Sequence, residues 1–149
     1  MGYNYRMTNI QAALGLSQLS NLKKIVKKKM NIGKIYYMNL KSNKNIQILP
    51  PNISYSKNIY WVVGIVVKSR IMTAKKLSKK LLKFGIVTRP FFYPMSEQKI
   101  LKKMKIFKNK QKYPNSNFLS KYGLYLPSYF SLKKKEISYI SGIVNKILN

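Results

Sequence analysis

The spacing of apolar residues in the first part of the chain predicts a long helix. Apolar side chains recur there at steps of three and four residues, at Ala12, Leu16, Leu19, Leu22, Val26 and Met30. Thr8 precedes this pattern, and Gln11 lies three residues after Thr8, which is the spacing of a capping box. We therefore expect a helix from about Asn9 to about Lys41.

Three further segments have the pattern of strands. NIQIL (45–49) is short and ends before two prolines, whereas IYWVVGIVV (59–67) is a continuous apolar run rich in β-branched residues. A run of the second kind is typical of a buried central strand, and we expect both segments in one sheet. GIVTRPFFYP (85–94) predicts a third strand that leaves the sheet at Pro90.

Helices are expected between and after these strands. Thr73 is placed to cap a helix that stops at Gly85, and a short helix is expected near 98–104. A loop rich in Lys and Asn (108–117) and a helix near 118–122 follow. Ser131 is expected to cap a last helix whose apolar face carries Ile137, Ile140, Val144 and Ile147. The fold class is α/β, with a long N-terminal helix and a small sheet of about three strands covered by helices.

The net positive charge of the chain favours binding to polyanions. Its 149 residues, 46% of them hydrophobic, suffice for one modest domain, yet 30 Lys and Arg face only Glu97 and Glu136, for a formal charge of +28. Such a field attracts nucleic acid or anionic membranes. Only Arg6, Arg70 and Arg89 are arginines, however, and nucleic-acid readers favour Arg. Abundant Lys, Asn, Ile and Tyr, whose codons are rich in A and T, also fit an AT-biased genome.

Missing residue types exclude several kinds of chemistry. The sequence contains no Cys, no His and, since both acids are Glu, no Asp. Disulfides, the common metal sites, Ser-His-Asp and Cys-His nucleophiles and paired carboxylates of glycosidases are therefore excluded. No stretch approaches the ~18–20 apolar residues of a membrane helix, and no signal peptide is recognisable, so we expect a soluble, cytoplasmic protein. Catalysis would need Lys, Tyr, Arg or a borrowed cofactor.

Three motifs, in order along the chain, carry a family resemblance. GYNYRMTNIQAALGLSQL (2–19) closely resembles the segment that follows the cofactor lysine of DegT/DnrJ/EryC1/StrS sugar aminotransferases. GIVTRPFFYPMSEQ (85–98) is similar to the sugar-side loop of that family, especially in members like perosamine synthase, although Gln98-Lys99 replaces a common Gln-Pro. SKYGLYLPSYFSL (120–132), followed by EISYI, resembles its C-terminal segment.

The resemblance implies part of a fold type I enzyme that depends on pyridoxal 5′-phosphate (PLP). Such enzymes move an amino group from L-glutamate to a keto-hexose nucleotide, in some members for lipopolysaccharide O-antigen biosynthesis, and work as homodimers with active sites at the subunit interface. The Schiff-base lysine and the aspartate at the pyridine nitrogen belong to a large domain upstream of the first motif. The chain is therefore expected to hold a motif segment and connecting helix (1–44) and a small α/β C-terminal domain (45–149), without the large domain.

The first motif supplies the expected cofactor contacts. Amide and guanidinium donors at a helix entrance suit an anion, because the helix dipole adds partial positive charge. The resemblance assigns Asn4 to the cofactor phosphate, with Arg6 as an anion clamp or interface residue and Tyr5 beside them. The alternative is that Asn4 caps a turn and Arg6 pairs on the surface.

The second motif supplies the expected substrate contacts. Arg89 is expected to face a phosphate or sugar hydroxyl, and Phe91, Phe92 and Tyr93 to stack on a base or sugar ring. The alternative is a strand end whose aromatic rings pack inside.

Other conspicuous residues are given structural roles. Tyr60 and Trp61 are assigned to packing, and the lysine runs 27–29 and 133–135 to solvated faces. Ile10, Leu14 and Leu16 are expected to be exposed, because a large domain would cover them in the family.

The sequence is compatible with three functional hypotheses. The first is a sugar aminotransferase part that needs a homodimeric or companion chain with the large domain, and that does not transaminate alone because no lysine stands out as a Schiff-base residue. The second is a basic module that binds nucleic acid or anionic surfaces, although its lysines are scattered through every predicted element. The third is a non-functional remnant.

Overall fold

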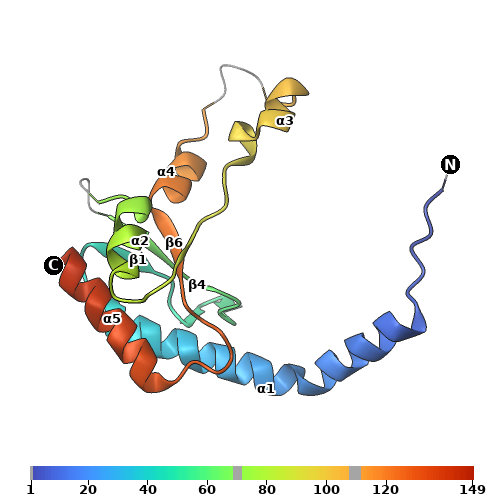
Figure 1. The fold of residues 1–149 in the computed structure, drawn as a ribbon, viewed down its shortest axis with the longest axis horizontal. Coiled ribbons are helices and arrows are strands. Elements are labelled where there is room, and N and C mark those ends of the chain that lie inside the picture. Colours follow the sequence, from blue (N-terminus) through green and yellow to red (C-terminus); the bar gives the residue numbers. More distant parts are fainter. Residues whose placement is uncertain (1, 69–71, 108–111) are drawn as a thin grey trace.

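The computed structural model describes residues 2–68, 72–107 and 112–149. A single long helix, α1 (Asn9–Leu40), runs beside a small α/β body. Figure 1 shows the C-terminal part of α1 against the body, while its N-terminal part projects away and ends in an extended arm. The arm consists of residues 2–8, all of them exposed.

The predicted start and length of α1 are confirmed. The Thr8 hydroxyl accepts a hydrogen bond from the Gln11 N–H at 3.3 Å, and the Gln11 side chain accepts one from the Thr8 N–H at 2.9 Å. The buried residues of α1 all lie in its C-terminal part, at Ile32, Gly33, Tyr36 and Leu40. The regular apolar spacing thus predicted the helix correctly, but only its second half faces a core.

The main sheet has four antiparallel strands rather than about three. It comprises β1 (Ile46–Ile48), β4 (Val63–Val67), β6 (Gly123–Leu126) and β5 (Arg89–Pro90), in the order β1-β4-β6-β5. As predicted, β4 is central and lies beside β1, but the predicted third strand is paired over only two residues. A separate hairpin joins β2 (Asn52–Ile53) to β3 (Ser56–Lys57).

The remaining helices follow the prediction except at two N-termini. They are α2 (Ala74–Leu82), the 3₁₀ turn η1 (Met95–Glu97), α3 (Lys99–Lys103), α4 (Pro114–Tyr122) and α5 (Lys134–Leu148). Thr73 caps α2 as expected, and Gly85 takes a positive φ of 73° just beyond it.

The expected boundaries of the last two helices were wrong. Helix α4 begins at Pro114, a residue suited to the first helical turn, so part of the predicted loop 108–117 is helical. Residues 108–111 of that loop lie outside the described residues. The cap of α5 is Lys133 and not Ser131, and its N–H donates to Glu136 Oε2 at 2.7 Å.

One face of the sheet forms the core. The side chains of Val63, Ile65 and Val67 on β4 and of Leu124 and Leu126 on β6 are buried there, with alternate positions on the opposite face. They join the buried residues of α1, α2 and α5 in one cluster. Polar contacts join α5 to α1 and to the turn that follows it: Asn145 Nδ2 donates to Asn39 O at 3.1 Å, and Asn43 Nδ2, just beyond α1, donates to Asn145 Oδ1 at 2.9 Å.

The Tyr60–Trp61 pair divides between two environments. Tyr60 is buried, as expected for packing, and its hydroxyl donates to Leu49 O at 2.9 Å. Trp61 is 70% exposed, so its assignment to packing was wrong. Both residues precede β4, and only Tyr60 reaches the core.

Candidate functional site

The predicted cofactor residues lie together on the arm that precedes α1. Asn4, Tyr5 and Arg6 are exposed, and the Asn4 Oδ1 accepts a hydrogen bond from the Arg6 N–H at 3.0 Å. This bond gives Asn4 the local turn that the alternative interpretation expected. The rings of Tyr3 and Tyr5 lie beside each other, with centroids 6.0 Å apart.

The donor groups of this arm fit a phosphate. Within residues 2–68, 72–107 and 112–149, neither the Asn4 amide NH₂ nor the Arg6 guanidinium donates to a protein acceptor. Neither acidic residue of the chain lies in the arm or in α1. The arm therefore offers one amide and one guanidinium donor group that are free to bind an anion.

The predicted substrate residues lie on and after β5, and they differ in exposure. Phe91 is half-buried, and its ring packs over Gly64 and Gly123 and stacks on Tyr125 with a centroid distance of 4.6 Å. Phe92 and Tyr93 are 73% and 59% exposed. Packing thus accounts for Phe91, whereas Phe92 and Tyr93 remain accessible.

The structure does not bring the two groups of residues together. Figure 1 places the arm at the far end of α1, whereas β5 pairs with β6 inside the body. Within one chain, the arm and the residues on and after β5 therefore form two separate groups.

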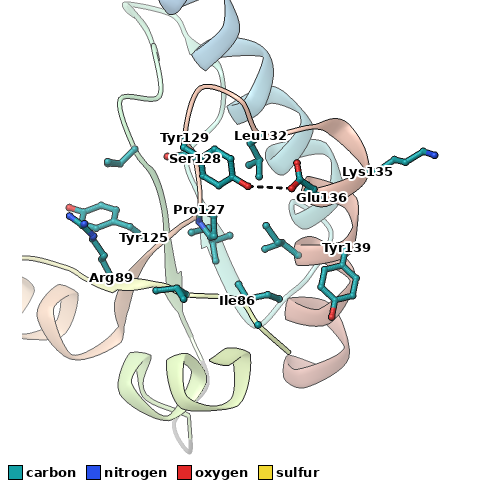
Figure 2. Close-up of a pocket in the computed structure, with 15 residues that line it drawn as sticks. Ile86, Arg89, Tyr125, Pro127, Ser128, Tyr129, Leu132, Lys135, Glu136 and Tyr139 are labelled. Atoms are coloured by element: carbon teal, nitrogen blue, oxygen red, sulfur yellow. Dashed lines mark hydrogen bonds between the residues drawn. The ribbon is translucent and has the colours of Figure 1, made fainter. Parts of the chain in front are cut away.

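A cavity of about 880 Å³ lies beside β6, and sequence reasoning missed it. Figure 2 shows it between the segment that follows α2, the connector 127–133 that joins β6 to α5, and α5 itself. Its lining is mainly apolar, with Ile86, Leu126, Pro127, Leu132 and Ile140, and includes Tyr125, Tyr129 and Tyr139. Arg89 is the one predicted site residue in that lining, and Lys135 supplies a second cation. No sequence signal could have revealed a space enclosed by segments this far apart along the chain.

The connector is fixed by hydrogen bonds from α1. The Tyr36 hydroxyl donates to Pro127 O at 2.9 Å, and Lys29 Nζ donates to Ser128 O at 2.5 Å and to Ser128 Oγ at 3.3 Å. Burial raises the pKa of Tyr36, and the nearby Tyr129 and Glu136 raise it further. Tyr36 therefore remains a neutral hydrogen-bond donor at ordinary pH.

Lys29 does not belong to a solvated face, as the sequence had suggested. Its side chain is half-buried, and burial lowers its pKa. The sequence did carry a signal, since Lys29 precedes Ile32 by three residues and Tyr36 by seven, which places all three on one helix face. Lys28 is likewise half-buried, whereas Lys27, Lys133, Lys134 and Lys135 are exposed as expected.

The described residues form neither a metal-ligand cluster nor a membrane-spanning helix. No group of three or more His, Cys, Asp or Glu side chains occurs among the described residues. Within the same residues, no helix is both long enough and apolar enough to span a bilayer. The polar side chains of the arm and of β5 can bind anions, and the exposed aromatic side chains after β5 can stack on rings.

Comparison with known proteins relates the whole chain to one group of enzymes. The profile of the DegT/DnrJ/EryC1/StrS aminotransferase family matches residues 1–145. GDP-perosamine synthase of Escherichia coli O157:H7 is 33% identical over 147 residues, which cover 98% of this chain and 38% of that protein. The chain thus spans less than two-fifths of that relative's length.

Solved structures agree with this fold. PseC of Helicobacter pylori, an aminotransferase involved in the biosynthesis of pseudoaminic acid, superposes with a TM-score of 0.85 at 23% identity, over 99% of this chain and 39% of that one. The PLP-form of Spr1654 from Streptococcus pneumoniae gives a TM-score of 0.80 at 19% identity, over 97% and 37% of the two chains. At such identities the likeness concerns the fold.

Proposed function

Because this chain belongs to the DegT/DnrJ/EryC1/StrS aminotransferase family, we propose that it is the carboxyl-terminal part of a PLP-dependent nucleotide-sugar aminotransferase. The complete enzyme transfers an amino group from L-glutamate to a keto-hexose nucleotide in the cytoplasm. The observation that carries this proposal is the 33% identity to GDP-perosamine synthase over nearly the whole chain. The connecting segment 1–44 and the small domain 45–149 would work with a large domain that holds the cofactor lysine.

The arm residues are the proposed cofactor contacts. The Asn4 amide and the Arg6 guanidinium would donate to the phosphate of PLP, and Tyr5 would lie beside them. The free donors on the arm and the absence of acidic residues from the arm and α1 support this assignment. When bound, the cofactor supplies the electron sink for amino transfer, which no side chain of this protein can provide.

The residues on and after β5 are the proposed substrate contacts. Arg89 would bind a phosphate or sugar hydroxyl, and the exposed rings of Phe92 and Tyr93 would stack on the base or sugar. Phe91 would act indirectly, because its ring fills the space over Gly64 and Gly123 and thereby fixes where the following residues leave the sheet.

We propose that the chain alone does not transaminate. The lysine that the resemblance assigns to the cofactor has no counterpart here, and Lys29, whose pKa is lowered, is engaged by Ser128. Activity would require the large domain, in a dimer whose arms each reach the neighbouring active site.

A chimeric enzyme tests the proposal. In the E. coli GDP-perosamine synthase, the part that corresponds to this chain would be replaced by this chain, and amino transfer from L-glutamate to a GDP-linked keto-hexose would be followed by mass spectrometry. We expect transfer by the chimera and none by the chain alone. Asn4→Ala in the chimera should raise the concentration of PLP needed for half-saturation by about tenfold, since one charge-assisted hydrogen bond is lost.

Two outcomes would contradict the proposal. A folded, dimeric chimera that binds PLP but transfers no amino group would overturn the assigned function. Transfer by the isolated chain would overturn the need for the large domain. Asn21→Ala, which changes an exposed asparagine on α1 away from the arm, is the matched control and should leave the PLP requirement unchanged.

The alternative of a polyanion-binding module receives less support. The lysines of this chain are distributed over α1, α2, α3 and α5, whereas specific binding of a polyanion needs a single basic face. A steep fall of RNA affinity with salt, together with an inactive chimera, would favour that alternative.

A further inference from the structure

The walls of the cavity beside β6 come from the body of the molecule. The residues that line it lie between Val62 and Ile140, in the segment after α2, in β6, in the connector 127–133 and in α5 (Figure 2). Its volume of about 880 Å³ falls within the range of small-molecule sites, roughly 300–1,000 Å³. Neither the arm nor α1 contributes to this lining, so the cavity is a hollow of the body itself.

On the side of α5, the polar groups of the lining already have partners in the protein. Glu136 accepts hydrogen bonds from the Tyr129 hydroxyl at 3.3 Å and from the Lys133 N–H at 2.7 Å. The Tyr139 hydroxyl donates to Phe84 O at 3.3 Å. Together with the apolar side chains of the lining, the tyrosine rings leave a surface that suits the flat face of an aromatic ligand.

Arg89 and Tyr125 provide free donors at the other end of the cavity. They are directly opposite each other in the β5–β6 pair, and Figure 2 shows their side chains next to each other, on the opposite side of the cavity from Tyr139. Among the described residues, neither the Arg89 guanidinium nor the Tyr125 hydroxyl donates to a protein acceptor, and Arg89 has no ion pair. A guanidinium and a phenol side by side suit an anionic oxygen group.

We propose that this cavity binds a small molecule with an aromatic body and one anionic oxygen group. Arg89 and Tyr125 bind the anionic group, and the ring lies against the apolar wall. A carboxylate and a phosphate monoester share this chemistry. Because Arg89 is also a proposed substrate contact, the ligand would compete with the nucleotide sugar; this consequence rests on the proposed function, whereas binding itself does not.

The test compares three matched probes on the full chain by isothermal titration calorimetry. Naphthoate, naphthyl phosphate and naphthylmethanol share the ring system and differ in the polar group. We expect the better anion to bind at least about tenfold more tightly than the alcohol, since only an anion forms charge-assisted hydrogen bonds. Which anion binds more tightly identifies the anionic group. The buffer contains about 0.15 M salt, so that distant lysines are screened beyond about 8 Å.

Matched variants locate the anionic group. Arg89→Gln should weaken binding of the better anion by about tenfold, whereas Lys75→Gln, the same loss of charge at an exposed position of α2, should weaken it by less than about twofold. Tyr125→Phe keeps the ring that stacks on Phe91 and removes the hydroxyl, so we expect a loss of about threefold.

A second pair of variants locates the ring. Val87 lines the cavity and is 68% exposed, so Val87→Trp should narrow the cavity without disturbing the core and weaken binding by about fivefold or more. Leu82→Trp, at a position on α2 that is 60% exposed and outside the lining, should leave binding unchanged. Thermal unfolding of each variant confirms that the fold is retained.

Several results would overturn the proposal. Equal loss in Arg89→Gln and Lys75→Gln would mean that only the overall charge attracts the probe. Equal binding of the alcohol and the anions, or no binding of either anion, would exclude an anion site. Unchanged binding in Val87→Trp would place the probe elsewhere. The chimera loaded with PLP should show the same loss with Val87→Trp; a folded chimera without this binding would mean that the large domain fills the cavity. Binding to the chain alone needs neither cofactor nor sugar, so it can fail while the proposed transferase function holds, and the reverse is also true.

Discussion

Tyr60 lies so close to Gly33 that no side chain fits between them. An ideal Cβ placed on Gly33 would fall 2.0 Å from Cγ of the Tyr60 ring. Tyr60 has a positive φ of 51°, and its N–H donates to Asn58 Oδ1 at 2.8 Å. The contact therefore joins the C-terminal part of α1 to the segment that leads into β4.

Gly33→Ala should destabilise the fold. The added methyl group must displace a buried ring whose hydroxyl is also bonded, so we expect a loss of about 2–3 kcal/mol in the free energy of unfolding. In Gly15→Ala, in the exposed part of the same helix, the added methyl group meets nothing within 4 Å. The free energy of unfolding should therefore rise by up to about 1 kcal/mol, because alanine favours the helix more than glycine does. Urea unfolding of both variants tests this contact, and equal stability of the two would contradict it.

Tyr60→Phe should reveal the titration of the buried phenol. Burial raises the pKa of Tyr60 from 10.0 to about 12. The folded chain therefore holds the phenol proton more tightly than the unfolded chain does. The stability that depends on the protonated phenol is complete below pH 10 and is lost as the pH rises through about 12. The variant should be less stable by about 1 kcal/mol at neutral pH, since the bond to Leu49 is absent. The difference from the native chain should shrink in alkali; a constant difference would argue against the shift.

Lys29→Met should loosen the connector between β6 and α5. Methionine keeps the apolar stem but cannot donate to Ser128, so the Leu132 amide should exchange about tenfold faster with solvent. Burial lowers the pKa of Lys29 in the folded chain below the 10.5 of the unfolded chain. Below that lowered pKa the folded chain bears the full cost of burying a charged lysine. As the pH rises toward 10.5, the lysine in the folded chain loses its proton first and the cost is removed. Native stability should accordingly rise relative to the variant over that range. Lys27→Met, on the exposed side, is the control and should change neither exchange nor pH dependence.

Phe91→Ala and Phe92→Ala should separate packing from ligand contact. Loss of the Phe91 ring uncovers Gly64, Gly123 and one face of Tyr125, so we expect about 1–2 kcal/mol of lost stability for this half-buried site. Phe92→Ala should leave thermal stability nearly unchanged and raise the KM of the chimera for its nucleotide sugar by roughly threefold to tenfold. An unchanged KM would remove Phe92 from the proposed substrate contacts.

Moderate salt should stabilise the chain. At a formal charge of +28, lysine–lysine repulsion opposes compaction. Raising the ionic strength from about 0.01 M to about 0.15 M shortens the screening length from about 30 Å to about 8 Å, and the melting temperature should rise. The test is to measure the melting temperature of the chain at several concentrations of sodium chloride. A melting temperature independent of salt would mean that self-repulsion contributes little.

Elements specified by neighbouring residues could be predicted from the sequence. The capping box of Thr8 and Gln11, the Thr73 cap and the stop at Gly85 depend on hydrogen bonds and backbone angles within a few residues. The apolar run of β4 likewise identifies a buried strand without knowledge of its partners. The three family motifs supplied what local physics could not, namely the expected cofactor and substrate class.

Only the tertiary structure decided which predicted surfaces are covered and which residues meet. It places Lys29 on Ser128, Tyr60 on Gly33 and β5 at the edge of a four-stranded sheet, while the first half of α1 and Trp61 stay exposed. Periodicity reports that a helix has an apolar face, but not what packs against it, because burial depends on segments far apart along the chain. The same reason explains why the cavity beside β6 emerged only from the folded molecule.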